Sequence, residues 1–136
     1  ECIIFLPSYL YGNMKDNPKE RCIELAKQST FRTRHGAVVV YNGIIIGSGF
    51  NINLSHPMVK VYNEFKTLHA EMIAIMRVKN KRLLKHSAIY VARINPKGDA
   101  MLSKPCTTCM KLIRNTWKIK DIFYTDNDGD WVKLDI

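Results

Sequence analysis

Two runs of β-branched residues joined by an Asn-Gly pair constrain the fold of this chain more than any other feature. Gly36–Tyr41 and Ile44–Phe50 each have the length and composition of a β-strand. Asn42 and Gly43 lie between them, and such a pair readily adopts the positive φ angles of a two-residue hairpin turn. Both runs are apolar almost throughout, which is typical of strands that helices cover on both faces. The sequence therefore predicts an antiparallel hairpin inside an α/β domain.

A helix is predicted immediately before this hairpin. Asn17-Pro18-Lys19-Glu20 is typical of a helix start, because Asn can cap the first free N–H groups and Pro suits the first turn. Glu20 stands three residues after Asn17 and completes a capping box. We expect this helix to continue to about Ser29.

The rest of the chain alternates between helical and strand-like segments. We expect a helix from about Leu68 to Lys79 with Thr67 as its cap, a strand over Ser87–Arg93, a helix from Cys106, and strands over Asp121–Thr125 and Trp131–Ile136. The turn-forming residues of Asp126–Asp130 favour an antiparallel pairing of the last two strands. The order α-β-β-α-β-α-β-β predicts one α/β domain of two or three layers over residues 1–136.

Composition bounds the class of protein. The chain has 136 residues, of which 46% are apolar and 24% charged, as in soluble globular proteins. No apolar run is long enough to span a bilayer, and the opening apolar stretch is too short for a signal peptide. Four cysteines are fewer than a secreted disulfide scaffold would show, so we expect a reducing, cytoplasmic setting. Cys2 and Cys22 are expected to be buried apolar side chains.

Two short motifs predict a metal site. His69 precedes Glu71 by two residues, and Pro105-Cys106 is followed by Cys109 at the start of a predicted helix. Thiolates in the first turn of a helix are stabilised by its free N–H groups and its dipole. His69, Cys106 and Cys109 give three protein ligands for Zn²⁺ and leave the fourth position for water, as in catalytic zinc sites.

Glu71 is the predicted proton carrier of this site. A carboxylate beside an activated water can take its proton and return it to the substrate. A C-x-x-C pair alone is also compatible with half of a structural zinc ribbon, but the sequence has no second such pair. A structural site has no use for Glu71, which favours catalysis.

The two motifs together match the H-x-E…P-C-x-x-C signature of the zinc deaminases. From about Cys22 to Thr125 the chain resembles the cytidine deaminase superfamily. The segments 69–75 (HAEMIAI), 105–113 (PCTTCMKLI) and 119–122 (IKDI) resemble the deoxycytidylate deaminases best. The resemblance implies a three-layer α/β/α sandwich with a central mixed sheet of about five strands.

The resemblance also implies roles for individual residues. It implies hydrolytic loss of ammonia at C4 of cytosine, with Glu71 passing protons to N3 and then to the departing amine. Asn51, in Gly49-Phe50-Asn51, matches the family residue that contacts the substrate sugar, although an ordinary turn residue is the alternative. Backbone groups of Ala70 would help to hold the base. A homo-oligomer is a further implication.

The net charge of +9 favours an anionic partner, either a nucleotide or a polynucleotide, although it also suits simple solubility. Arg32 and Arg34 precede the first strand and are candidates for gripping a phosphate, with a solvated basic loop as the alternative. The basic segment 77–82 with Lys85 is expected to be a solvated face. His35 and His86 are expected to be surface or hydrogen-bonding residues.

Three functions remain open at this point. The first is deamination of cytosine in a free nucleoside or nucleotide, such as cytidine or dCMP. The second is deamination of cytosine or adenine within single-stranded DNA or RNA, including tRNA. The third, from another class, is a zinc-stabilised binding module that has lost activity.

Overall fold

The computed structural model describes residues 17–30, 32–51 and 69–134. In chain order its elements are α2 (Pro18–Gln28), β1 (Arg34–Tyr41), β2 (Ile44–Phe50), α3 (Ala70–Met76), the 3-10 helix η3 (Lys81–His86), β3 (Ala88–Ile94), β4 (Ala100–Met101), α4 (Thr107–Lys111), the π-helical turn η4 (Leu112–Thr116), β5 (Asp121–Thr125) and β6 (Trp131–Lys133). The predicted order of the larger elements is confirmed, and η3 and β4 are additional.

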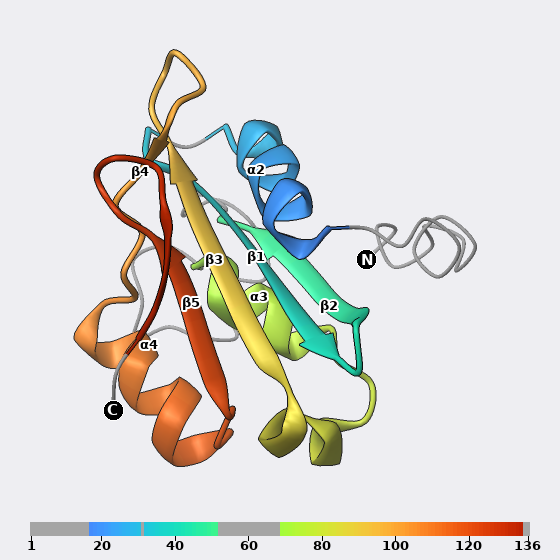
Figure 1. Ribbon diagram of the computed structural model, residues 1–136. Helices are drawn as coiled ribbons and strands as arrows, with labels where there is room; N and C mark the ends of the chain where they lie inside the picture. The colour runs from blue at the N-terminus through green and yellow to red at the C-terminus, as the bar shows by residue number, and fades with distance from the viewer. Residues whose placement is uncertain (1–16, 31, 52–68, 135–136) are drawn as a thin grey trace.

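A mixed sheet forms the centre of the molecule (Figure 1). Its main path runs β2-β1-β3-β5-β6, and β4 pairs with β3 beside that path. β3 and β5 are parallel, and the other pairs are antiparallel. The prediction of about five strands is confirmed, with the two-residue β4 as a sixth. The predicted antiparallel end is also confirmed, because β6 runs antiparallel to β5.

The predicted hairpin is present with the predicted turn. Asn42 and Gly43 have φ values of 50° and 77°, as a type I′ turn requires. Asn17 also caps α2 as predicted, since its side chain accepts a hydrogen bond from the N–H of Lys19 at 2.9 Å.

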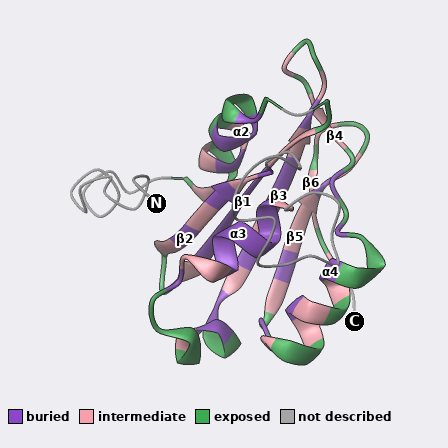
Figure 2. Ribbon diagram, turned by 180° about the vertical axis from the view of Figure 1, so that it is seen from behind, coloured by how far each residue is buried: buried purple, intermediate pink, exposed green. Residues whose placement is uncertain are grey.

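Helices cover the sheet on both sides and make three layers. On one face the fully buried Cys22 of α2 packs with Val38 and Ala92. On the other face α3 and α4 enclose a larger core that includes Met72, Ile89 and Ile113. Nearly all of α3 is buried (Figure 2), which explains its continuous apolar sequence. The three-layer alternative is therefore the one that this chain adopts.

Two predicted boundaries are corrected. α3 begins at Ala70, two residues later than expected, because His69 is extended with ψ 151° and occupies the N-cap position. The expected cap Thr67 lies outside the described residues. α3 also ends at Met76, before Lys79, and Asn80 starts η3 by accepting a hydrogen bond from the N–H of Arg82 at 3.0 Å. No helix in the described ranges is long and apolar enough to cross a membrane.

Candidate metal centre

Three side chains from distant parts of the chain meet between α3 and α4. Their ligand atoms, one from each of His69, Cys106 and Cys109, all lie within 4.8 Å of one another. His69 Nδ1 is 3.0 Å from Cys109 Sγ and 3.8 Å from Cys106 Sγ. This cluster is the predicted zinc ligand set.

The ends of two helices hold these side chains. His69 is the N-cap of α3, and Cys106 is the N-cap of α4. The Cys109 N–H donates to Cys106 Sγ at 3.5 Å, so the free N–H groups of this turn face sulfur. His69 and Cys106 therefore lie just ahead of their helices, and Cys109 lies in the first turn of α4.

The geometry and chemistry of the cluster fit zinc. A tetrahedral zinc with bonds of about 2.1 Å to nitrogen and about 2.3 Å to sulfur separates N from S by about 3.6 Å. The two N–S distances of 3.0 and 3.8 Å lie on either side of that value. Burial, followed by the charges of Glu71 and Cys106, raises the pKa of the Cys109 thiol far above its usual range. A bound cation would stabilise the thiolate form of Cys109 against this cost of burial.

Glu71 lies beside the cluster in the first turn of α3. It is buried, with 4% of its surface exposed. Burial raises the pKa of this carboxyl, against smaller opposite effects of its own backbone and of His69. A buried carboxylate whose pKa is raised accepts a proton more readily than an exposed one, which suits proton transfer. Ala70, the first residue of α3, is fully buried, and its N–H is among those that a helix start leaves without an internal partner.

Asn51 is engaged in internal hydrogen bonds. Its Oδ1 accepts from the Ser29 hydroxyl at 2.7 Å and from the His35 N–H at 2.9 Å, and its Nδ2 donates to the Thr33 carbonyl at 2.6 Å. These bonds join the end of β2 to the start of β1 and to the end of α2. Among the described residues, one amide hydrogen of Asn51 has no hydrogen-bond partner.

The two arginines predicted to hold phosphate are not brought to the cluster together. Side chains of a strand alternate between its faces. Ala37 and Val39 pack in the core beneath α3, whereas a Cβ atom on Gly36 would meet the backbone of α2. Arg34 is in phase with Gly36 and so lies on the α2 face, opposite the cluster. Arg32 is exposed ahead of β1.

Two residues that the sequence analysis did not select face the cluster side of the sheet. His35 is in phase with Ala37 on β1, and its register partner Arg93 is in phase with Val91 on β3. Burial is the main cause that lowers the pKa of His35 to about 4, and the charges of Arg93 and His69 act in the same direction. Strand alternation alone could have put His35 on this face. Its pairing with Arg93 depends on the contact of β1 with β3.

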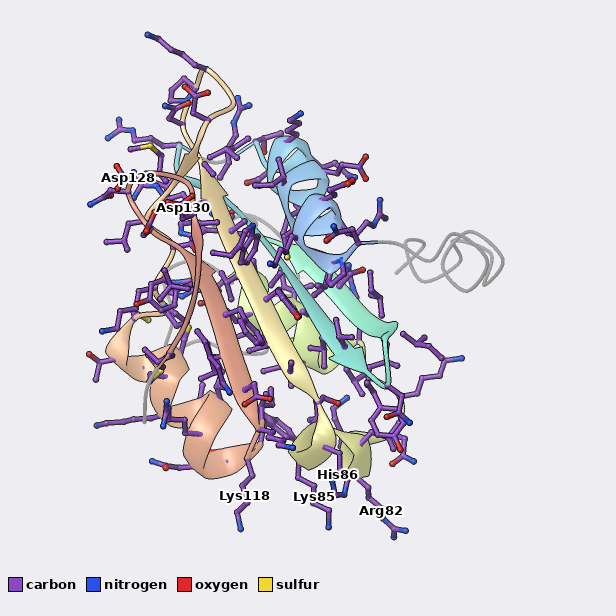
Figure 3. The ribbon with its side chains drawn as sticks, in the orientation of Figure 1. Arg82, Lys85, His86, Lys118, Asp128 and Asp130 are labelled. Atoms are coloured by element: carbon purple, nitrogen blue, oxygen red, sulfur yellow. The ribbon has the colours of Figure 1, made fainter. Side chains whose placement is uncertain are left out.

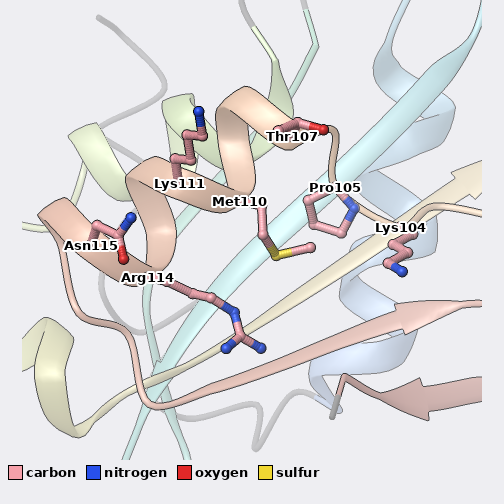
Figure 4. Close-up of a pocket in the computed structure, with 7 residues that line it drawn as sticks. All are labelled: Lys104, Pro105, Thr107, Met110, Lys111, Arg114 and Asn115. Atoms are coloured by element: carbon pink, nitrogen blue, oxygen red, sulfur yellow. The ribbon is translucent and has the colours of Figure 1, made fainter. Parts of the chain in front are cut away.

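A cavity of about 330 Å³ lies next to the cluster, along α4 and η4 (Figure 4). Among the described residues, its lining contains three cations and no acidic side chain: Lys104, Pro105, Thr107, Met110, Lys111, Arg114 and Asn115. None of the three zinc ligands lines this cavity, but Pro105 and Thr107 flank the ligand Cys106.

The predicted basic face around Lys85 lies in another part of the molecule. Arg82, Lys85 and His86 point away from one end of the sheet, and Asp128 and Asp130 lie at the other (Figure 3).

The comparison with protein families decides the identity of this site. Residues 14–126 match the model of the cytidine and deoxycytidylate deaminase zinc-binding region. The chain belongs to this family. It is therefore a zinc-dependent deaminase with zinc as its cofactor, and His69, Cys106 and Cys109 are its zinc site. None of the curated proteins compared with this deaminase matches it.

Solved structures share the fold of this deaminase. The dCMP deaminase from the cyanophage S-TIM5 is similar with a TM-score of 0.58 at 22% identity over 87% of each chain. Cytidine deaminase from Burkholderia pseudomallei has a TM-score of 0.58 at 18% identity, covering 85% of this chain and 90% of its own. The diaminohydroxyphosphoribosylaminopyrimidine deaminase/5-amino-6-(5-phosphoribosylamino)uracil reductase from Thermotoga maritima has a TM-score of 0.53 at 25% identity, with 87% of this chain and 31% of its own covered.

Proposed function

We propose that this deaminase hydrolyses the amino group from the cytosine base of a free nucleoside or nucleotide, such as cytidine or dCMP. The observation that carries the proposal is the buried Glu71 beside the zinc ligand His69, with its pKa raised. The family model, which covers cytidine and deoxycytidylate deaminases, supports the choice of cytosine. Glu71 argues against a binding module without activity.

Each residue of the site has a part in this reaction. Bound zinc supplies the activation of a water molecule for attack on the base. Glu71 transfers one proton from the attacking water to the ring nitrogen and then a second proton, from the new hydroxyl group on the base, to the departing amine. Its burial keeps these protons from bulk solvent. The N–H of Ala70 at the start of α3 is available to hold the base, and the remaining amide hydrogen of Asn51 is available to the sugar.

A base within single-stranded DNA or RNA is the second candidate substrate. The cavity beside Cys106 supports it, because Lys104, Lys111 and Arg114 line it with no acidic side chain among its described lining residues. Cations placed in this way can follow a phosphodiester backbone. The single domain, the homo-oligomer and the cytoplasmic location remain predictions.

A substrate panel tests the proposal. Zinc-loaded protein is incubated with cytidine, deoxycytidine, their monophosphates, adenosine and single-stranded oligonucleotides, and ammonia release is measured. We expect turnover of the free cytosine compounds, and Glu71→Gln should retain zinc and fold while it loses turnover. Turnover of oligonucleotides alone would establish the second candidate and overturn the first. Full activity of Glu71→Gln would remove this residue from the reaction.

A further inference from the structure

Arg93 and His35 form a cross-strand pair on the face of the sheet that is covered by α3 and α4, the two helices that position the zinc ligands. The two residues are register partners on β3 and β1. Both are half-buried, so each side chain keeps contact with solvent. Their phase on the strands matches that of Val91 and Ala37, which pack beneath α3. The pair therefore faces the same layer as the catalytic machinery.

Arg93 lacks an anionic partner in the described part of the chain. One terminal nitrogen donates to the Leu102 carbonyl at 3.3 Å, but the Nε is buried without any hydrogen-bond partner. The two salt bridges formed by described residues involve Arg21 and Lys133, not Arg93. A half-buried cation with an unsatisfied donor is costly unless an anion completes it.

His35 connects this pair to the sugar side of the site. Its backbone N–H donates to Asn51 Oδ1 at 2.9 Å, and its carbonyl accepts from the Asn51 N–H at 3.2 Å. Burial lowers the pKa of the His35 ring to about 4. At neutral pH the ring is therefore uncharged and can donate a hydrogen bond without adding a second buried cation.

We propose that Arg93, with His35 beside it, binds a phosphate group carried by the substrate. The guanidinium donors of Arg93 match two oxygens of a phosphate, and His35 adds a neutral donor from the next strand. The inference rests on the proposed function, since it assigns the phosphate of a cytosine nucleotide to this pair. The same chemistry would serve the 5′-phosphate of a mononucleotide or a phosphodiester of a single strand.

The test compares phosphorylated and unphosphorylated substrates. In wild-type protein, Arg93→Lys, Arg93→Met and the control Arg82→Met, kcat and KM are measured for deoxycytidine, dCMP and a short single-stranded oligonucleotide. Arg82 is an exposed cation in η3. We expect Arg93→Met to lower kcat/KM for dCMP by about 10- to 100-fold through KM, while turnover of deoxycytidine stays within about twofold. Arg93→Lys should restore part of the loss, and Arg82→Met should resemble the wild type.

The outcomes separate the inference from the proposed function. An equal loss on dCMP and deoxycytidine in Arg93→Met would show a structural role and overturn the inference. If Arg93→Met lowers turnover of the oligonucleotide alone, the inference is supported, and the phosphate that Arg93 binds is a phosphodiester. Absence of turnover by the wild type would contradict the proposed function. Binding of dCMP and deoxycytidine to zinc-loaded Glu71→Gln, measured by calorimetry, would then decide the inference, and equal affinities would overturn it.

Discussion

Ser103 and Thr125 are joined by hydrogen bonds where the chain returns to the sheet, just before the zinc ligand Cys106. Their hydroxyl oxygens are 2.8 Å apart, and the Thr125 N–H donates to Ser103 Oγ at 2.8 Å. The Ser103 hydroxyl also donates to the Val91 carbonyl at 2.7 Å. These buried bonds tie the long connection after β3 to both β3 and β5, and so they hold the entry to α4.

Ser103→Ala should therefore weaken both the fold and the zinc site. The substitution removes a hydrogen-bond partner from the buried Thr125 N–H and from the buried Val91 carbonyl. This loss lowers the unfolding free energy by about 1–3 kcal/mol. Zinc affinity should fall by roughly tenfold, because Cys106 loses its support. Urea denaturation and competition with a zinc chelator measure the two effects.

Ser87→Ala is the matched control for that prediction. Ser87 is equally buried, and its hydroxyl donates to the Leu83 carbonyl at 2.7 Å at the other end of β3. It should lose stability but keep the zinc affinity of the wild type. Equal zinc affinities in both serine variants would contradict the role given to Ser103.

Replacing a ligand thiol should remove the metal. Cys106→Ser and Cys109→Ser each exchange a soft thiolate for a hydroxyl that does not ionise at neutral pH, so zinc should fall from about one per chain to near zero. Cys22→Ser is the control, since this buried thiol packs on the opposite face and donates to the Tyr90 carbonyl at 3.2 Å. Elemental analysis of dialysed protein gives the zinc content. A full zinc load in Cys109→Ser would rule out this ligand set.

The close approach of α3 to the sheet requires a glycine. A Cβ atom on Gly47 would lie 2.3 Å from the Ala74 carbonyl oxygen, so Gly47→Ala must push α3 away from β2. We expect a loss of about 1–3 kcal/mol in unfolding free energy and a fall in zinc affinity, because α3 carries His69. Gly36→Ala meets the backbone of α2 in the same way, at 2.2 Å from the Cys22 carbonyl oxygen. Gly36→Ala should lower stability and leave zinc affinity unchanged. A fall in zinc affinity in Gly36→Ala but not in Gly47→Ala would be inconsistent with this packing.

His35 should make stability depend on pH in the acid range. Its pKa is about 4 in the folded protein against an ordinary value of 6.5, so the unfolded chain binds the proton first. Its contribution is fully present above pH 6.5 and is lost as the pH falls toward 4. The loss is on the order of 1–2 kcal/mol for a half-buried group. Denaturation between pH 7 and pH 4 should show a shallower decline in His35→Gln than in the wild type, while the exposed His86→Gln should follow the wild type.

Much of the site could be predicted because its parts are local. A C-x-x-C turn and a carboxylate two residues from a histidine are short-range patterns, and both lie at helix starts as expected, although the cap of α3 is His69 and not Thr67. The substrate-binding roles of Asn51 and Arg34 stay predictions. Asn51 uses most of its amide inside the fold, and Arg34 lies on the α2 face, since a strand residue's face follows from its phase.

The sequence by itself determined the hairpin, the three zinc ligands with Glu71, and the alternation that produces layered α/β structure. All of these depend on residue type and spacing over a few positions. Only the tertiary structure decided which strands are neighbours. The pairing of β1 with β3 places His35 opposite Arg93. The pairing of β3 with β5 places Thr125 where it forms the buried hydrogen bond with Ser103. Such pairings join residues that lie far apart in the chain, so short-range sequence patterns do not predict them. They form because one strand order buries the sheet between α2 on one face and α3 with α4 on the other.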